Sequence, residues 1–489
     1  MTLNNIIMKT KIIMSFILIV LFSGCTGDLD VVNKSAVSSK SMWKEEGDAT
    51  AAMYGMYNQF RDAFSSGYVT WGEYRTGLWG DGLTGQTSRD QVYQNQIPAN
   101  HYFSDWTGLY TTINAANLIL KHAPDIRFNS EESKNDVMAN AYFVRAFCYY
   151  WIGRIWGDAP LLLDGFESDA QDDLYPSRTP AEKIFEQVGK DVDNALSLIP
   201  SKVIRNRASY AGISMLKADY DLWMYKVRNA GDPYLKDASE KISNVLDNSS
   251  YGLESNFADV FDDNSGKEVI FEWSYVQDEF TTGAANDYLV PSQYITSKYV
   301  NSPVQTGSHQ QWCFLTPKYK DFLTANPKDQ RAKVSFSTFY DSEKKQTFQW
   351  INKFKGHWVN DTRVFDSDIL VYRYADALLM DAEIKLAQKD IKGAVTSLNR
   401  IAYRAYGEDG YYSTSMSSSE VIKTIIAERK KEFAAEGKLW WDFIRLGVAF
   451  DENPYLKGRE NEPNVLLWPV SQNSINRNPD LKQTEGYDK

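Results

Sequence analysis

Residues 417–447 read SSSEVIKTIIAERKKEFAAEGKLWWDFIRLG, and this stretch decides the fold of the C-terminal region. Ser417 and Glu420 have the S-x-x-E spacing of a capping box, which predicts that a helix begins here. Apolar residues recur at helical spacing after Val421, and Gly437 suits the left-handed residue that follows a helix end. The sequence therefore predicts a helix, a tight stop and a second short helix.

Three glutamates in this stretch, Glu428, Glu432 and Glu436, recur every four residues. Like charges at this spacing repel each other unless cations lie between or opposite them. The candidate cations in the same stretch are Arg429, Lys431 and Arg445. Because tryptophans flank the charges, we favour a partly buried ionic net that fixes the C-terminal region on the core over a solvated charged face. We interpret this net as structural and not catalytic.

The composition describes a large acidic protein that is rich in aromatic residues. The chain has 489 residues, a formal net charge of −11, 14 Trp and 30 Tyr. An acidic protein binds nucleic acid poorly, so we expect no nucleic-acid partner. Core packing accounts for most of the rings, but the surplus suggests exposed aromatic faces of the kind that stack on sugar rings.

The N-terminus predicts export. Lys9 and Lys11 form a positive region, and residues 12–22 form an apolar run of signal-peptide length. This run is too short to cross a bilayer. Residues 22–25, FSGC, resemble a bacterial lipobox, which implies cleavage after residue 24 and a lipid on Cys25; an ordinary signal peptide with a chance cysteine is the alternative. We therefore expect residues 1–24 to be a lipoprotein signal peptide.

Helical patterns dominate the rest of the chain, which we predict to be one domain, residues 42–489, after a tether at 25–41. Antiparallel helix pairs with alanines at their crossing points are typical of tetratricopeptide-like repeats. Accordingly, we predict a mainly α fold: a superhelical scaffold of helix pairs with irregular, partly β, ligand-binding insertions. The expected scaffold covers about 42–64, 105–248 and 369–447, the insertions cover 65–104 and 249–368, and a C-terminal strap covers 448–489. Long irregular segments inside a compact domain are usually functional, and we predict that the two insertions meet to form the ligand surface.

Four sequence blocks resemble the SusD/RagB family. Residues 139–160 read ANAYFVRAFCYYWIGRIWGDAP, close to the family pattern R-A-x-x-Y-x-x-L-x-x-x-W-G-D-x-P. Residues 372–407, which begin YRYADALLMDAE, resemble its R-Y-A-E-x-L-L-M-x-A-E block. Residues 428–447 and 467–487 resemble its E-R-x-x-E-F and N-P-x-L-x-Q-x-x-G-Y blocks, in the same order. Departures such as Leu439, where arginine is common, affect only the scaffold.

The resemblance implies a lipid-anchored lipoprotein of the outer membrane that faces the cell surface and captures an oligosaccharide. It would deliver this ligand to a SusC-like TonB-dependent barrel, on which the helix pairs would pack. Since no family motif carries the ligand residues, we chose them from the two irregular segments for their flat rings and short polar side chains. The chosen residues are Arg75, Trp79, Asp81, Gln86, Trp273, Tyr275, Asn286 and Trp312.

Other functions remain as alternatives. A peptide-binding member of the same family would need fewer stacking rings, and a glycoside hydrolase would need two carboxylates about 5–10 Å apart. We predict no catalytic residues, no metal site and no cofactor, because none of the four histidines has a zinc spacing and there is no G-x-S-x-G elbow or P-loop. A disulfide between Cys148 and Cys313 has no support from their spacing and stays open.

Overall fold

The computed structural model describes residues 42–65, 67–168, 174–262, 266–276, 287–360 and 362–487. The predicted signal peptide, Cys25 and the whole of the predicted tether therefore lie outside the described residues. Among the residues described, no helix has the length and apolarity needed to cross a membrane. Cys148 and Cys313 are both buried free thiols, so they form no disulfide.

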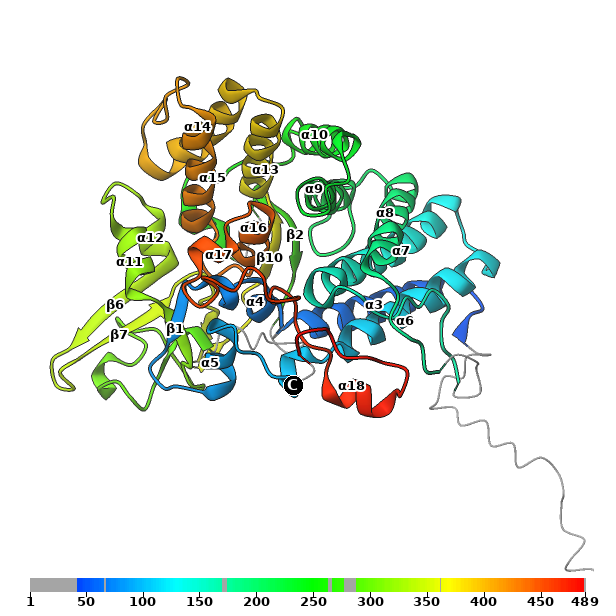
Figure 1. Cartoon of the computed structure of the whole chain (residues 1–489), viewed down its shortest axis with the longest axis horizontal. Helices are drawn as coiled ribbons and strands as arrows, with labels where there is room; N and C mark the ends of the chain where they lie inside the picture. Colours follow the sequence, from blue (N-terminus) through cyan, green and yellow to red (C-terminus); the bar gives the residue numbers. More distant parts are fainter. Residues whose placement is uncertain are drawn as a thin grey trace, which may run out of the picture. The chain divides into compact units, whose positions relative to one another are not determined.

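Long helices form the frame, which confirms the predicted mainly α fold. In the described ranges these helices pack as pairs, α3 with α6, α7 with α8, α9 with α10 and α13 with α14. Figure 1 shows the pairs following one another from α3 and α6 round to α13, α14 and α15. Their bounds are α3 Glu46–Ser65, α6 Thr107–His122, α7 Glu131–Trp156, α8 Ala181–Leu198, α9 Tyr210–Lys226, α10 Asp232–Leu246, α13 Tyr374–Ala387, α14 Ile391–Tyr406, α15 Ser418–Glu432 and α16 Leu439–Arg445.

Helix α7 shows how the sequence places these helices. Its first turn is capped by Ser130, whose hydroxyl accepts a hydrogen bond from the Ser133 amide at 3.0 Å. Gly157 follows its last residue with a φ of +71°, which favours glycine. Between these ends the helix is buried almost all round in its second half, because it packs against both α6 and α8.

Shorter elements complete the chain, and most of them lie in the two irregular segments and the C-terminal strap. The helical ones are α4 Gly67–Gly72, η1 Tyr74–Thr76, α5 Thr87–Tyr93, η2 Tyr102–Ser104, η3 Ala123–Asp125, η4 Phe257–Phe261, η6 Ser297–Tyr299, α11 Pro317–Thr324, α12 Arg331–Ser335, α17 Ala449–Glu452 and α18 Gln472–Arg477. The strands are β1 Trp79–Asp81, β2 Val269–Trp273, β3 Val290–Pro291, β4 Thr306–Gly307, β5 Cys313–Leu315, β6 Phe336–Asp341, β7 Gln346–Ile351, β8 His357–Val359, β9 Thr362–Val364 and β10 Ile369–Arg373. They form separate two-stranded sheets, of which β3–β4 is parallel and the others are antiparallel.

One predicted helix boundary is wrong. We expected a helix from residue 369, but Ile369–Arg373 is strand β10, and α13 begins at Tyr374. The strand is buried at every position and pairs with β2, which joins the second irregular segment to the scaffold. A short apolar run with β-branched residues fits a buried strand as well as a helix start, and the pairing partner decides between them.

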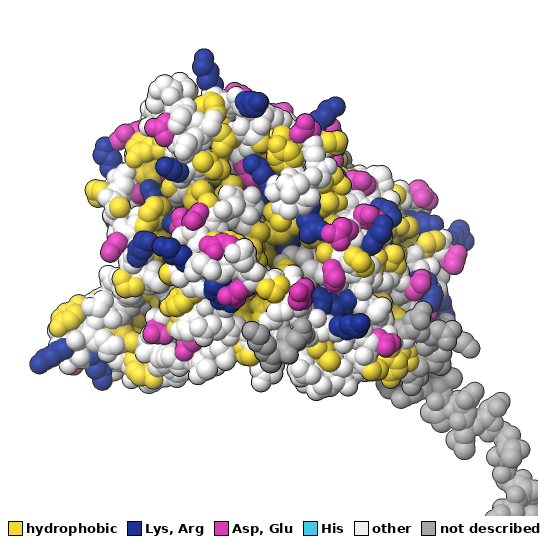
Figure 2. Space-filling view, in the orientation of Figure 1, with side chains coloured by type: hydrophobic (Ala, Val, Ile, Leu, Met, Phe, Trp, Pro, Cys, Tyr) yellow, Lys and Arg dark blue, Asp and Glu magenta, His cyan; other side chains and the backbone are white. Residues whose placement is uncertain are grey.

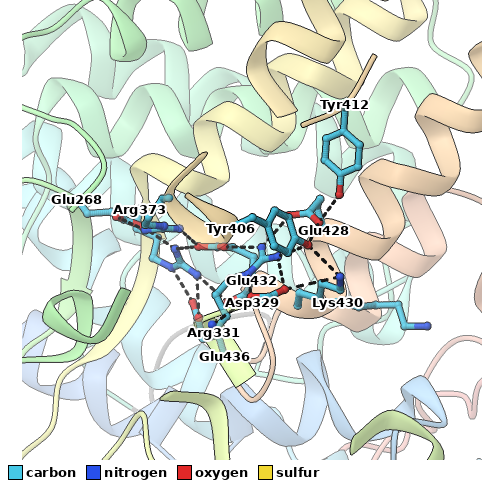
Figure 3. A network of polar contacts seen from close by, with 12 residues as sticks. Glu268, Asp329, Arg331, Arg373, Tyr406, Tyr412, Glu428, Lys430, Glu432 and Glu436 are labelled. Carbon is cyan, nitrogen blue, oxygen red and sulfur yellow. Dashed lines mark hydrogen bonds and ion pairs between the residues drawn. The ribbon is translucent and has the colours of Figure 1, made fainter. Parts of the chain in front are cut away.

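The capping box at the start of α15 and the left-handed Gly437 are both confirmed. The predicted net is confirmed too, and it is fully buried. Figure 3 shows Arg373 and Arg331 pointing toward the carboxylates of α15. Arg373 Nη1 lies 2.7 Å from both Glu268 and Glu432, and its Nη2 lies 2.9 Å from Glu436.

The cations of the net differ from those expected. Glu428 and Glu432 pair with Arg331, at 2.8 and 3.1 Å, and Lys353 pairs with Glu436 at 2.7 Å. Within the expected set, Arg429 and Arg445 pair instead with Asp442 and Glu383, and Lys431 lies 3.6 Å from Asp329. The net therefore ties the second irregular segment, which carries Arg331 and Lys353, to the C-terminal helices.

This net predicts a loss of stability in acid. Burial alone would raise the pKa of Glu436, but Arg373, Lys353 and Lys438 outweigh it and lower the pKa from 4.5 to about 2. A carboxylate whose pKa is lower in the folded state stabilises the fold above pH 4.5, and this contribution is lost as pH falls toward 2. The lowered pKa of Glu436 corresponds to about 3 kcal/mol in the free energy of unfolding at neutral pH.

We therefore expect Glu436→Gln to be less stable than the wild type at neutral pH, with a gap that narrows below pH 4.5. Urea unfolding at several pH values measures this gap. Glu186, which is half exposed and pairs with Lys183, provides the matched control Glu186→Gln, for which we expect almost no change. If the stability difference between the wild type and Glu436→Gln stays constant down to pH 2, the pKa of Glu436 is not lowered by the net.

Candidate ligand-binding site

The two irregular segments meet at one short ladder. Strand β1 of the first segment pairs with β5 of the second, with Gly80 opposite Phe314 and Asp81 opposite Cys313. Beyond the strands, the Gly82 amide donates to the Trp312 carbonyl and the Thr84 amide donates to the Gln311 carbonyl, both at 3.1 Å. This confirms the prediction that the two segments come together.

The ladder depends on a glycine. A Cβ atom at Gly82 would lie 2.2 Å from the Gln311 carbonyl oxygen, far inside contact distance. Any other residue would push the two segments apart at the point where they cross. Thus the sequence at residue 82 allows the close approach that holds Trp312 beside the first segment.

Five side chains gather next to this ladder, and we call them the Trp312 cluster. Asp287 lies at its centre, 2.9 Å from Arg89 Nη2 on one side and 2.9 Å from His309 Nδ1 on the other. The His309 ring packs edge-to-face on Trp312, with 4.6 Å between centroids. The Arg89 guanidinium lies 5.5 Å from the Trp312 ring and 5.9 Å from the Tyr102 ring.

The cluster has a buried base and an exposed top. Arg89 and Asp287 are almost fully buried, whereas Tyr102 is 52% exposed and the His309 side chain is 44% exposed. Burial raises the pKa of Asp287, and the nearby Arg89 and His309 oppose that rise. The buried pair thus fixes the positions of two rings and an imidazole that solvent can reach.

Such an arrangement suits a polyhydroxyl ligand. Trp312 is partly buried and held in place by His309, so it offers a rigid flat surface. Asp81, at the end of β1, is exposed and accepts a hydrogen bond from the Tyr93 hydroxyl at 2.6 Å. Its second oxygen and the His309 ring can bind ligand hydroxyl groups, while the rings stack on the apolar face of a sugar.

Four of the eight residues chosen from the sequence are in the interior, which corrects that choice. Arg75 is fully buried and holds the C-terminal strap by donating to the Val465 carbonyl at 2.6 Å and the Leu466 carbonyl at 2.7 Å. Trp79 is 1% exposed and stacks on Tyr288, with 5.7 Å between centroids. Both side chains are therefore part of the scaffold.

Trp273 and Tyr275 are also interior, at 2% and 4% exposure. Trp273 stacks on Phe64, with 4.8 Å between centroids, inside an aromatic core that includes Phe60 and Phe147. Strand β2 is buried on both faces, so its alternating pattern does not separate core from surface. Without that pattern, the sequence could not show that these rings belong to the core.

The other four residues have different positions. Trp312 is in the cluster, Asp81 is exposed beside it, and Gln86 immediately precedes α5, the helix that carries Arg89. Asn286 lies outside the described residues, next to Asp287. Sequence reasoning missed Arg89, Tyr102, Asp287 and His309, although His309 is three residues before Trp312 and this spacing could have drawn attention to it.

Comparisons with known proteins agree with this architecture. A family model described as "Starch-binding associating with outer membrane" matches residues 38–216, and one described as "SusD family" matches residues 340–487. The chain belongs to the SusD/RagB family. SusD-like protein P2 of Formosa agariphila is 27% identical over 97% of this chain and 99% of that protein. SusD-like protein P38 of the same species is 24% identical, over 95% and 96% of the two chains.

Solved structures of SusD-superfamily proteins have the same fold. NanU of Bacteroides fragilis superposes with a TM-score of 0.81 at 24% identity, covering 93% of this chain and 99% of that one. A SusD-superfamily protein from Bacteroides vulgatus has a TM-score of 0.79 at 26% identity, covering 91% of this chain and 100% of that one. The helix pairs and the irregular segments described above are therefore those of a SusD fold.

The side chains show little sign of metal chemistry. Within the described ranges, no group of three or more His, Cys, Asp or Glu is arranged to hold a metal ion. On the face shown in Figure 2, basic and acidic side chains are interspersed over the surface. The Trp312 cluster, which lies beside the ladder where the two irregular segments meet, is the candidate site on which we base the function.

Proposed function

We propose that this protein is a glycan-binding lipoprotein of the outer membrane that captures oligosaccharides at the Trp312 cluster without chemical change. One observation carries the proposal: a partly exposed tryptophan, braced by His309, lies where the two irregular segments of a SusD fold meet. The family descriptions of starch binding and outer-membrane association support the ligand class and the location.

Delivery and anchoring complete the proposal. A lipid on Cys25 would hold the protein on the cell surface through the residue 25–41 tether, and a SusC-like TonB-dependent barrel would receive the ligand. Such a barrel would pack on the helix pairs of the scaffold, which are elements other than the β1–β5 ladder that carries the cluster. Binding and transfer would then use different elements of the fold.

Isothermal titration calorimetry tests the binding step. The chain without residues 1–25 would be titrated with oligosaccharides from starch, xylan, mannan and polygalacturonate and, separately, with a mixture of peptides, and each oligosaccharide mixture would then be analysed for products. We expect at least one oligosaccharide to bind and to be recovered unchanged. Cleaved product would favour a glycoside hydrolase, and binding of peptides alone would favour the peptide-binding alternative.

A further inference from the structure

A second ring platform lies on the β8–β9 hairpin. All 14 tryptophans are within the described residues, and Trp358 is the most exposed of them, at 41%. Large apolar side chains are costly to expose, and a tryptophan that gains no core packing is a candidate for ligand contact. No sequence pattern singled out Trp358, because its hairpin has too few residues to show a period.

The ring is braced from one side. Trp358 of β8 pairs in register with Arg363 of β9, and the Arg363 guanidinium carbon lies 4.7 Å from the centre of the Trp358 ring. Arg363 is itself held by donating from Nη1 to the Lys355 carbonyl. Burial lowers the pKa of Arg363 to about 10, in keeping with a guanidinium packed between ring and backbone. One face of the indole is thus fixed, which leaves the other for a ligand.

The base of the hairpin is rigid as well. The Gly356 amide donates to the Ser367 hydroxyl at 2.7 Å, and His357 Nδ1 lies 2.8 Å from Asp366. Gly356 has a φ of +59°, and a Cβ there would lie 1.9 Å from the Val364 carbonyl oxygen. A ring on such a support loses little conformational freedom when it binds.

The hairpin is connected to the Trp312 cluster through the core. Phe354, just before the hairpin, stacks on Tyr288 with 5.9 Å between centroids, and Tyr288 follows Asp287 of the cluster. The two platforms have different neighbours, since Trp312 contacts Arg89 and His309 whereas Trp358 contacts Arg363. The two rings therefore have separate supports within one connected part of the fold.

We propose that Trp358 and Arg363 form a second sugar-binding subsite, which stacks a pyranose ring of an oligosaccharide whose other end lies on the Trp312 cluster. This inference rests on the proposed function. Trp358 supplies the exposed stacking ring, and Arg363 holds that ring from its other face while donating to the Lys355 carbonyl. The subsite makes affinity depend on the length of the glycan.

Calorimetry with disaccharides and with octasaccharides of starch, xylan, mannan and polygalacturonate tests the subsite. We expect Trp358→Ala to lower the affinity of the octasaccharide that binds the wild type about tenfold, with the disaccharide unchanged. Arg363→Ala should have a similar, smaller effect, and Trp358→Tyr should restore part of the loss. Tyr340→Ala, which removes a 59% exposed ring from β6, is the matched control and should change neither affinity.

The outcomes separate this inference from the proposed function. If Trp358→Ala binds the octasaccharide as the wild type does while Trp312→Ala does not, the subsite is wrong and the proposed function stands. If no oligosaccharide binds the wild type, both are wrong. If Trp358→Ala weakens short and long glycans equally, with an unchanged melting temperature, Trp358 belongs to the primary site and the subsite is overturned.

Discussion

Trp312→Ala is expected to lower oligosaccharide affinity about thirtyfold or more, with almost no change in melting temperature. Truncation of a rigid ring at the centre of a binding site costs about 2 kcal/mol or more, which corresponds to this change in affinity. The ring is partly exposed and its recorded partners, His309 and Arg89, remain held by Asp287, so little of the fold depends on it. Calorimetry and thermal unfolding of the same preparation measure both quantities.

Trp273→Ala is the matched control. It removes the same side chain from the same irregular segment, but from inside the aromatic core. We expect it to destabilise the fold by about 3–5 kcal/mol, as large core truncations do. Because Trp79 is buried as well, we expect Trp79→Ala to lower the free energy of unfolding in the same way. A Trp312→Ala protein that unfolds while Trp273→Ala stays stable would reverse our assignment of core and site.

Arg373→Met is expected to lower the free energy of unfolding by about 3–5 kcal/mol, because removal of one partner from a buried ionic net leaves the others uncompensated. Arg373 is fully buried and faces Glu268, Glu432 and Glu436. Its loss would leave three buried carboxylates with fewer counter-charges. Chemical denaturation at neutral pH measures the change.

The exposed pair Lys183–Glu186 provides the control for this prediction. Its two side chains are 61% and 51% exposed, and Lys183→Met should change stability by less than about 1 kcal/mol. If Arg373→Met is as harmless as Lys183→Met, the net does not hold the second irregular segment on the helices.

The sequence predicted the frame because its signals are local. The capping box of Ser417 and Glu420 and the periodic apolar faces need only neighbouring residues, and the helices they predict are present. The ionic net was predicted from the spacing of its glutamates, but its main cations were not. Arg331 and Arg373 lie far from α15 in the sequence, so only the fold brings them to it.

The site was harder to predict than the frame, since composition does not distinguish core from surface rings. Trp273 and Trp312 both lie in the second irregular segment, yet the first is in the core and the second is partly exposed. Arg89 and Asp287 become partners only through the β1–β5 ladder, which joins segments more than two hundred residues apart. The meeting of the two segments was predicted, whereas the residues that make the cluster needed coordinates.

A crystal structure of the protein with the oligosaccharide that binds most tightly tests the central claim most directly. We predict a sugar ring stacked on Trp312, with hydroxyl groups within hydrogen-bonding distance of Asp81 or His309. A sugar bound elsewhere, for example in the cavity of about 660 Å³ that Arg154 and Trp223 line beside the C-terminal strap, with Trp312 unoccupied, would contradict the account.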